Sequence, residues 1–349
     1  MTIDSQNLPL AIAVDLGGTQ LRVAVLHGAK QISRISILIG KELAPDRLIP
    51  RIYSTMQQAL DNADKRIEQV AGIGIGIAGP LDSRTGVVFA SPNLPGWNHI
   101  PLRTILEERY TLPVFVENDA NAAALGEHLF GAGRGYKDMI YLTISTGIGG
   151  GIIVNDQLLE GTSGTAGELG HMTVDWHGDR CNCGNIGCLE SIASGTAIAR
   201  RAREAMKRGV DFFAQDRANP EPRPPNNPGQ MSRVDAEVVA RAAKAGLPEA
   251  CAIIKDAAEA LGVGLVNLIH IFNPHRIVLG GGVTQMGSLL LDPAQQIVKT
   301  RTMKTPYEAV RIVKAHLGAD SGLVGAGALI YARGNERGIA QSGAVMASS

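Results

Sequence analysis

The sequence predicts an α/β fold with two related lobes. Predicted strands and helices alternate in both halves of the 349-residue chain, a length that suits one large or two medium domains. Two turns rich in glycine and threonine, Gly17–Gln20 and Ser145–Gly149, each join two predicted strands, so the second half repeats the element order of the first. Ligands of such folds bind at the carboxyl ends of strands, where both turns fall.

Composition and charge exclude several classes of protein. The 33 basic and 33 acidic residues balance, so no basic field points to nucleic acid or an anionic membrane as a partner. Met1–Pro9 carries Asp4 and no Lys or Arg, unlike a signal peptide. The apolar stretch Ala260–Phe272 is interrupted by Asn267 and His270, and no run reaches membrane-spanning length. Four cysteines suit a reducing compartment. We therefore expect a cytoplasmic protein.

The elements of the first half are predicted from local patterns. A buried apolar run predicts the first strand, alternation predicts the third, and helical spacing or alanine content predicts the helices. The predicted strands are Leu10–Leu16, Leu21–Leu26, Gln31–Ile39, Ile73–Ala78 and Val114–Glu117. The predicted helices are Ala44–Arg66, Leu102–Arg109 and Asp119–Leu129.

The second half repeats strand, turn and strand before its helices. The predicted strands are Met139–Ile144, Gly150–Val154, Gln157–Leu159, Arg276–Leu279 and Val310–Ala315. The predicted helices are Leu189–Lys207, Val234–Lys244, Pro248–Ile271 and Ser321–Tyr331, with one more helix between the last two strands. Gly209–Ser232 contains five prolines from Pro220 to Pro228, which predicts a surface excursion with little regular structure.

We expect a small N-terminal lobe at 1–118, against which a C-terminal helix at about 320–333 packs. A large lobe at 119–319 would carry a metal-binding loop at 168–190. The tail 334–349 is expected to be disordered.

Three thiols and one imidazole lie within 18 positions of each other: His171, Cys181, Cys183 and Cys188. Three cysteines and one histidine form a closed tetrahedral zinc set, and glycines within the loop allow the tight turns that bring sulfurs together. The alternative is a surface disulfide or scattered buried cysteines; the fourth cysteine, Cys251, lies far away in a helical pattern. A closed metal site does not perform chemistry, so we expect structural Zn²⁺ to fix the loop.

Polar residues of this loop are predicted to point into a pocket. Glu168 and Glu190 bracket the cysteines, and with His171 they supply donors and acceptors suited to neighbouring sugar hydroxyls. Asn93, in the rigid loop Pro92–Trp97, is a further candidate for a polyol hydroxyl, although a turn held by prolines explains it equally well.

The two glycine-rich turns are candidate phosphate sites. In the first, Asp15, Gly17, Gly18 and Thr19 offer backbone N–H groups, a hydroxyl and a carboxylate for Mg²⁺, though an ordinary hairpin turn is the alternative. The second, with Thr146 and Gly147, strengthens this interpretation, because two turns, one per lobe, suit a triphosphate lying across a cleft.

Two further glycine patterns occur in the sequence. The triplet that includes Gly281 and Gly282 leaves room for a base or ribose, or else serves close packing of strand and helix. Gly74–Gly79 matches the dinucleotide fingerprint formally, but the match lies inside a predicted strand and no helix comes after it. We therefore discount it. No Walker A pattern occurs in the sequence.

A carboxylate at the end of a buried strand is the candidate general base. In Glu117-Asn118-Asp119, Asp119 would accept a proton from a substrate hydroxyl. The alternative is that Asp119 caps the next helix; Asn118 is also suited to capping, which would leave Asp119 to other roles.

Together these motifs resemble the ROK family of sugar kinases, repressors and related proteins, and most of all its bacterial glucokinases. The resemblance runs from Asp15–Thr19 to Ser321–Gly327, and its most specific part is Glu-x-Gly-His followed by Cys-x-Cys-Gly-x-x-Gly-Cys-x-Glu. It implies the two-lobed, ribonuclease H-like fold shared with actin and hexokinase, with a catalytic cleft between the lobes. It also implies phosphorylation of a hexose at its 6-hydroxyl by ATP with Mg²⁺, and a homodimer or homotetramer.

The resemblance also assigns residues. The residue matching Asp119 is the base, those matching Asn118, Glu168, His171 and Glu190 hold the sugar, and His171 binds zinc with the three cysteines. Glucose is the expected substrate; N-acetylmannosamine, N-acetylglucosamine, fructose and mannose stay open, as does ADP or polyphosphate as donor.

Proteins of other functional classes share this family's fold. A ROK repressor needs an additional DNA-binding segment at its N-terminus, and the first predicted strand begins near Leu10, which leaves no room for one. A non-catalytic sugar sensor is the third possibility; Asp119 and both phosphate turns argue against it. We therefore expect a kinase.

Overall fold

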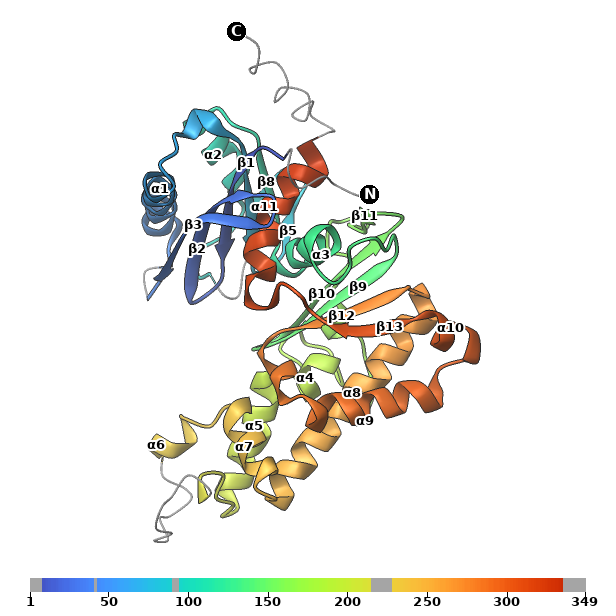
Figure 1. The fold of residues 1–349 in the computed structure, drawn as a ribbon. Helices are drawn as coiled ribbons and strands as arrows, with labels where there is room; N and C mark the ends of the chain where they lie inside the picture. Colours follow the sequence, from blue (N-terminus) through green and yellow to red (C-terminus); the bar gives the residue numbers. More distant parts are fainter. Residues whose placement is uncertain (1–7, 41–42, 90–93, 215–227, 335–349) are drawn as a thin grey trace. The chain divides into compact units, whose positions relative to one another are not determined.

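The computed structural model describes residues 8–40, 43–89, 94–214 and 228–334 (Figure 1). The chain divides into two compact units. Unit 1 comprises Met1–Tyr141, Gly150–Gly167 and Val313–Ser349, and unit 2 comprises Leu142–Gly149 and Glu168–Ile312. The predicted boundary between lobes at residues 118 and 119 stays a prediction, and the tail 335–349 lies outside the described residues.

A five-stranded sheet with the order β3-β2-β1-β4-β8 forms the centre of unit 1. Its strands are β1 (Leu10–Leu16), β2 (Gln20–His27), β3 (Lys30–Leu38), β4 (Val70–Ile77) and β8 (Val114–Asn118). Strand β2 runs antiparallel to β1 and β3, whereas β1, β4 and β8 are parallel. The residues of β1 after Leu10 are buried, because both faces of the sheet are covered.

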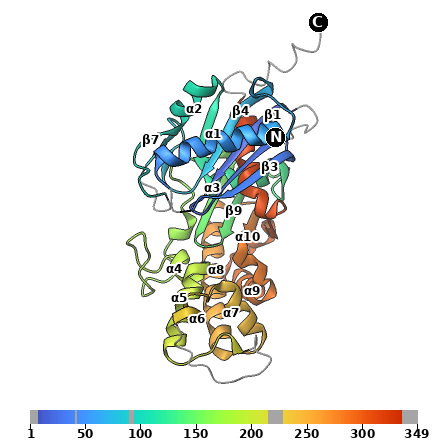
Figure 2. The ribbon, with the colours of Figure 1, turned by 90° about the vertical axis from the view of Figure 1, so that its left-hand side faces the viewer.

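Alternate residues of β1 face different helices. Ile12 and Val14 belong to a hydrophobic cluster with α1 (Pro45–Asn62), whereas Ala13 clusters with α11 (Ser321–Arg333). Successive side chains of a strand point to opposite faces, so α1 and α11 cover opposite faces of this sheet (Figures 1 and 2).

Helix α11 approaches the sheet closely because β4 contains glycine. A Cβ at Gly74 would lie 1.8 Å from the carbonyl oxygen of Ala326. Gly74 therefore serves helix packing, and it lies within β4 together with Gly76, which agrees with discounting the dinucleotide fingerprint.

A small sheet with the order β5-β6-β7, which was not predicted from the sequence, comes after β4 in the chain. Its strands are β5 (Leu81–Asp82), β6 (Val87–Val88) and β7 (Ile100–Pro101).

A buried carboxylate ties α3 (Asp119–Phe130) to the segment that leads into α11. Glu127 is fully buried and accepts hydrogen bonds from Ala132 N at 2.8 Å and Ser321 Oγ at 2.9 Å. It also accepts from His316 N at 3.1 Å and Leu317 N at 2.8 Å. These bonds join parts of the chain about 190 residues apart and keep α3 and α11 in contact.

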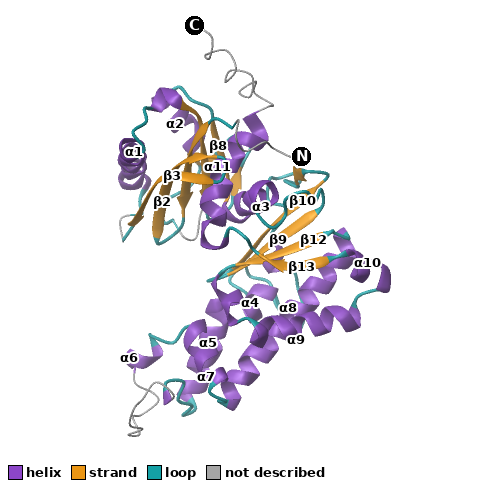
Figure 3. Cartoon of the chain, viewed as in Figure 1, coloured by secondary structure: helices purple, strands orange, loops and turns teal. Residues whose placement is uncertain are grey.

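The second sheet has the order β11-β10-β9-β12-β13 (Figure 3). Its strands are β9 (Met139–Ile144), β10 (Ile148–Val154), β11 (Gln157–Leu158), β12 (Arg276–Gly280) and β13 (Arg311–Lys314). The long helix α8 (Pro248–Phe272) contacts most helices of unit 2 and buries an extensive apolar face.

The remaining elements are short or lie around this frame. The α-helices are α2 (Leu102–Tyr110), α4 (Leu189–Ala193), α5 (Gly195–Lys207), α6 (Pro228–Met231), α7 (Ala236–Lys244), α9 (Ser288–Arg301) and α10 (Lys304–Ala309). The 3-10 helices are η1 (Ile67–Gln69), η2 (Leu169–His171), η4 (Gly282–Met286) and η5 (Gly318–Asp320). Within the described ranges no helix is long and apolar enough to cross a membrane.

Two helix predictions need correction. The helix predicted at Leu189–Lys207 is two helices, because Ser194 has an extended backbone (φ −73°, ψ 161°) and its side chain caps α5 through Ala197 N at 3.2 Å. The helix predicted to reach Arg66 ends at Asn62. In the proline-rich excursion, residues 215–227 lie outside the described part of the chain, and Pro228–Met231 forms α6.

Candidate functional site

The predicted zinc ligands gather in one cluster. The ligand atoms of His171, Cys181, Cys183 and Cys188 all lie within 4.8 Å of one another. Cys181 Sγ lies 3.7 Å from His171 Nδ1, and Cys183 Sγ lies 3.7 Å from Cys188 Sγ. None of the four cysteines of the chain, including exposed Cys251, forms a disulfide. The alternative of scattered or disulfide-bonded cysteines is therefore not what the structure shows.

These distances fit a tetrahedral metal ion. With Zn–S bonds of about 2.3 Å and a Zn–N bond of about 2.0–2.1 Å, tetrahedral geometry places two sulfurs about 3.8 Å apart and sulfur and nitrogen about 3.6 Å apart. Burial raises the pKa of the Cys188 thiol to about 12 and also raises that of Cys181. Three thiols this close do not ionise together without a cation, so the cluster has the chemistry of a metal centre.

The imidazole of His171 links the cluster to a carboxylate. Nδ1 faces Cys181, while Nε2 lies 3.9 Å from Glu168 Oε2. Metal-binding histidines commonly use the second ring nitrogen to contact an acceptor, which orients the ring. The structure therefore brings Glu168 and His171 together, and their predicted role toward a sugar stays a prediction.

Asn118 caps α3. Its Oδ1 accepts hydrogen bonds from Ala120 N at 2.9 Å and Asn121 N at 3.3 Å. Asp119 is the first helical residue, where its Oδ1 accepts from Ala120 N at 2.9 Å. The positive end of the helix dipole favours an ionised carboxylate at this position. Capping thus belongs mainly to Asn118, the alternative that the sequence left open.

A buried ion pair lies directly behind this helix start. Glu117 is fully buried, and its Oε2 lies 2.6 Å from Arg333 Nη2. Its Oε1 accepts from Asn118 N at 2.9 Å and Asn121 Nδ2 at 3.1 Å. Burial raises the pKa of Glu117, and Arg333, which also binds Glu160, opposes that rise. Sequence reasoning missed this pair because its partners are 216 positions apart.

The carboxylate of the first glycine-rich turn is already paired. Asp15 is buried in β1 and forms an ion pair with Arg22 of β2. Burial raises the pKa of Asp15, while Arg22 lowers it. Arg22 also donates to Ala319 O at 2.7 Å, so it spans from the turn to the start of α11. The turn itself is closed by Gly17 N donating to Gln20 O at 3.1 Å, and Thr19 is exposed.

The second turn is held by the helix that begins after the last metal ligand. Glu190 Oε2 accepts a hydrogen bond from Ile148 N at 2.7 Å. A Cβ on Gly147 would lie 2.5 Å from that carboxylate oxygen, so only glycine fits beside it without a shift. Thr146 is exposed, and its carbonyl oxygen accepts from Thr196 Oγ1 at 2.8 Å.

The glycines of the triplet differ in their surroundings. Gly281 has φ +87°, and a Cβ there would lie 2.3 Å from Ile144 O, so this residue is required by packing against β9. A Cβ on Gly282 would meet nothing within 4 Å. Gly282 is exposed, and its assignment to a base or ribose stays a prediction. The remaining sugar-binding candidate, Asn93, lies outside the described residues.

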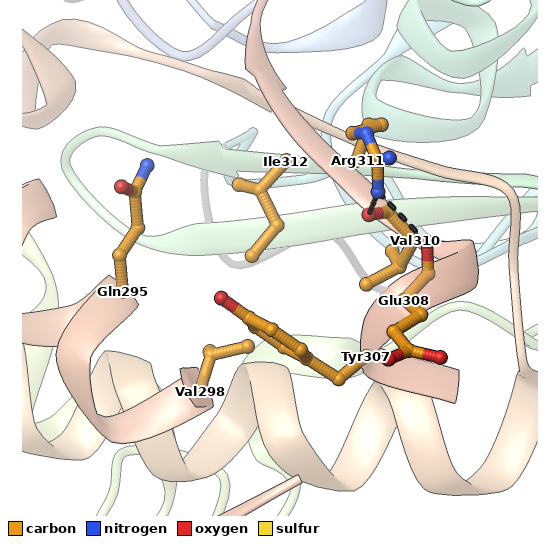
Figure 4. A pocket seen from close by; sticks show the side chains of 7 residues that line it. All are labelled: Gln295, Val298, Tyr307, Glu308, Val310, Arg311 and Ile312. Carbon is orange, nitrogen blue, oxygen red and sulfur yellow. Dashed lines mark hydrogen bonds between the residues drawn. The ribbon is translucent and has the colours of Figure 1, made fainter. Parts of the chain in front are cut away.

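A cavity of about 520 Å³ lies elsewhere in unit 2 (Figure 4). It is bounded by α9, α10 and β13 and lined by Gln295, Val298, Tyr307, Glu308, Val310, Arg311 and Ile312. Arg311 Nη1 donates to the backbone oxygens of Glu308 and Val310, each at 2.9 Å, so this guanidinium is engaged by its own loop. None of the predicted site residues lines this cavity.

The model of the ROK family matches residues 11–333. The chain belongs to the ROK family. It is 36% identical over 323 residues to a glucokinase of Thermotoga maritima, covering 92% of this chain and 97% of that one. It is 32% identical over 311 residues to a putative xylose repressor of Caldicellulosiruptor, covering 88% of this chain and 74% of the repressor.

A solved ROK structure supports the same architecture. A glucokinase from Streptomyces griseus, in complex with glucose and AMPPNP, superposes with a TM-score of 0.74 at 33% identity. The match covers 92% of this chain and 98% of that one. The predicted class, an α/β fold of the two-lobed ROK and hexokinase type, is thereby confirmed.

Proposed function

We propose that this ROK protein is an ATP-dependent hexose kinase that converts glucose and ATP to glucose 6-phosphate and ADP. Similarity to glucokinases over more than nine-tenths of the chain supports the activity. The observation that carries the proposal is that Asn118 is the main cap of α3, accepting from Ala120 N and Asn121 N, whereas Asp119 shares the bond from Ala120 N.

Asp119 acts as the general base in this proposal. It accepts the proton of the sugar 6-hydroxyl as the γ-phosphoryl group is transferred. The neighbouring pair of Glu117 and Arg333 fixes the end of β8 from behind and keeps the buried charge of Glu117 compensated. Asn118, Glu168, His171 and Glu190 hold the sugar hydroxyls, with Asn93 as a further candidate.

The nucleotide is assigned to the glycine-rich segments. Asp15, Gly17, Gly18 and Thr19 of the first turn and Thr146 and Gly147 of the second contact the phosphates, and Gly281 and Gly282 lie against the base or ribose. Mg²⁺ neutralises charge on the phosphates when bound. Because Asp15 is paired with Arg22, its role toward Mg²⁺ is best served through a water molecule.

Zn²⁺ is assigned to His171, Cys181, Cys183 and Cys188 as a structural ion. The donor set and its spacings support zinc. With all four positions taken by protein, the ion supplies rigidity to the loop rather than Lewis-acid chemistry. Thiolate ligands of this kind suit a reducing cytoplasm, which is the location we propose.

A sugar-responsive repressor is the second candidate, favoured by the 32% identity to the putative xylose repressor. Such a protein would share the metal loop and the sugar residues and would have no need of phosphoryl transfer. Among kinases, N-acetylmannosamine, N-acetylglucosamine, fructose and mannose are alternative substrates, because single pocket hydrogen bonds decide between such sugars.

A coupled assay of ADP release tests the proposal, with Mg²⁺-ATP and each of the five sugars in parallel. Highest activity on glucose is expected. Preference for another sugar would support kinase activity with that sugar as the substrate. If folded and zinc-loaded protein binds a sugar but releases no ADP with any of the five, the repressor or sensor is favoured. ADP and polyphosphate are then tested as phosphoryl donors. Size-exclusion chromatography tests whether the protein is a dimer or tetramer.

A further inference from the structure

Glu190 lies at a junction between the metal loop and the second glycine-rich turn. It is the second residue after the ligand Cys188, near the start of α4. Its backbone position is fixed on the loop side, because Leu189 N donates to Met172 O at 3.0 Å and Cys188 Sγ contacts His171 O at 3.4 Å. Its side chain reaches in the other direction, to Ile148 N at 2.7 Å.

The two carboxylate oxygens of Glu190 differ in their contacts. Oε2 holds the N–H of Ile148, the first residue of β10. No residue in the described part of the chain hydrogen-bonds to Oε1. One oxygen therefore fixes the turn while the other is available to a sugar hydroxyl, so the sugar role proposed for Glu190 does not compete with its contact to the turn.

Other groups of the turn have partners of their own, and Ser145 N donates to Gly147 O at 2.8 Å within it. Gly195 N donates to Ser145 O at 2.8 Å, and both Thr196 N and Thr196 Oγ1 donate to Thr146 O, at 3.2 and 2.8 Å. These bonds leave the N–H at Ile148 to Glu190. A charge-assisted bond from a carboxylate to a backbone N–H is stronger than a neutral one, so Glu190 helps to fix the conformation of this end of the turn.

Gly147 belongs to the same contact between the turn and Glu190. Its φ is not in the left-handed region, so no unusual backbone conformation requires glycine there. A Cβ there would lie 2.5 Å from Glu190 Oε2, at the end of a flexible side chain, so an added methyl group would shift the carboxylate away from Ile148 N. The glycine of the turn is therefore explained by the carboxylate as well as by the approach of a phosphate.

We infer that Glu190 is a positioning residue for nucleotide binding: it sets the phosphate-binding conformation of the Thr146–Ile148 turn from the metal-braced loop. This inference rests on the proposed function, because it concerns the nucleotide assigned to that turn. It implies that the zinc loop orders part of the phosphate site in addition to the sugar site.

Three variants and one control separate this role from sugar binding. Glu190→Ala removes the acceptor at Ile148 N, and Gly147→Ala displaces it. Glu190→Gln keeps a carbonyl oxygen that accepts from Ile148 N while removing the charge. Glu204→Ala is the matched control, since Glu204 is an exposed carboxylate on α5 that pairs only with Arg200 among the described residues, at 3.0 Å.

Two measurements are made on each zinc-loaded protein: amide hydrogen exchange at Ile148, and the affinity for Mg²⁺-AMPPNP without any hexose. We expect Glu190→Ala and Gly147→Ala to exchange Ile148 faster and to bind AMPPNP about tenfold more weakly or worse, the loss of one charge-assisted hydrogen bond. Glu190→Gln, which keeps an acceptor at Ile148 N but loses the charge, should fall between the wild type and Glu190→Ala in both measurements. Glu204→Ala should resemble the wild type in both, with zinc content equal throughout.

The outcomes are distinguishable. A residue that only contacts sugar would change glucose affinity and leave hexose-free AMPPNP binding and the exchange of Ile148 unaltered; that result overturns the inference alone. If the wild type binds AMPPNP neither alone nor with any hexose, the proposed function fails and the inference fails with it.

Discussion

Arg333 Nη2 lies 2.6 Å from Glu117 Oε2, and together they form an ion pair behind the proposed catalytic helix. Glu117 is fully buried on β8, and Arg333 is the last residue of α11. A charge buried this deeply is tolerated only with a partner. The pair thus joins the end of α11 to the strand that carries Asn118.

Arg333→Met should destabilise the protein by about 3–5 kcal/mol, because it leaves the carboxylate of Glu117 buried without its cation. Urea unfolding followed by circular dichroism measures this loss. The double variant Arg333→Met/Glu117→Gln should recover a large part of it. Equal stability of both variants would show that the pair is not coupled.

The free energy of unfolding should depend on pH through the titration of Glu117. Burial raises its pKa in the folded state above the ordinary 4.5, so the folded protein holds this proton more tightly than the unfolded chain. The resulting stabilisation is complete below the unfolded pKa and is lost as pH rises through the folded pKa. The free energy of unfolding of the wild type, minus that of Glu117→Gln, should therefore fall as the pH rises above the ordinary pKa of 4.5. A constant difference would contradict this.

Asp119→Asn should bind glucose as the wild type does and lose about 10²–10⁴-fold in kcat, because the amide cannot accept the hydroxyl proton. Steady-state kinetics and calorimetry with glucose check the two halves. Asp46→Asn, an exposed residue of α1, is the control and should be unchanged. Turnover of Asp119→Asn near that of the wild type would remove Asp119 from the role of base.

Cys188→Ser should reduce the zinc content to well below one ion per chain and lower Tm by ~4–8 °C, the shift that ~2 kcal/mol produces in a domain of about 150–250 residues. Elemental analysis and thermal unfolding measure the two effects. Cys251→Ser removes an exposed thiol outside the cluster and should change neither. Full zinc content in the Cys188 variant would mean that the cluster is not the metal site.

Two adjacent glycines should respond differently to alanine. Gly281→Ala should destabilise by about 1–3 kcal/mol, since the new methyl group meets Ile144 O at 2.3 Å. Gly282→Ala should stay within ~0.5 kcal/mol of the wild type. Any loss of AMPPNP affinity in Gly282→Ala is then attributable to contact with the nucleotide. A folding defect in Gly282→Ala would contradict the conclusion that Gly281 is tightly packed and Gly282 is not.

Elements with strong periodicity were predictable from sequence. The strands predicted at Leu10–Leu16 and Met139–Ile144 have those bounds in the structure, and the predicted Pro248–Ile271 helix extends one residue further. Two-residue strands such as Leu81–Asp82 are too short to show any period, and Lys304–Ala309, with Pro306 inside, carries no helix signal.

The site was predictable where its residues are close in sequence. Spacing alone revealed the cluster that includes Cys181 and Cys188. Long-range partners were not predictable: Arg22 beside Asp15 required the register of β1 and β2, and Ile148 beside Glu190 required the packing of α4. A sequence shows which groups are present, whereas the partners that restrain them depend on tertiary structure.

The bonds of Glu127 to Leu317 N and Ser321 Oγ have a consequence for biosynthesis. Unit 1 contains the beginning of the chain and Val313–Ser349, so its sheet stays without α11 while the ribosome makes the residues of unit 2. During that interval the apolar face of β1 and β4 has no cover, and Glu127 lacks the partners that the last segment supplies. The nascent protein is therefore most open to aggregation, and most in need of a chaperone, just before its final segment emerges.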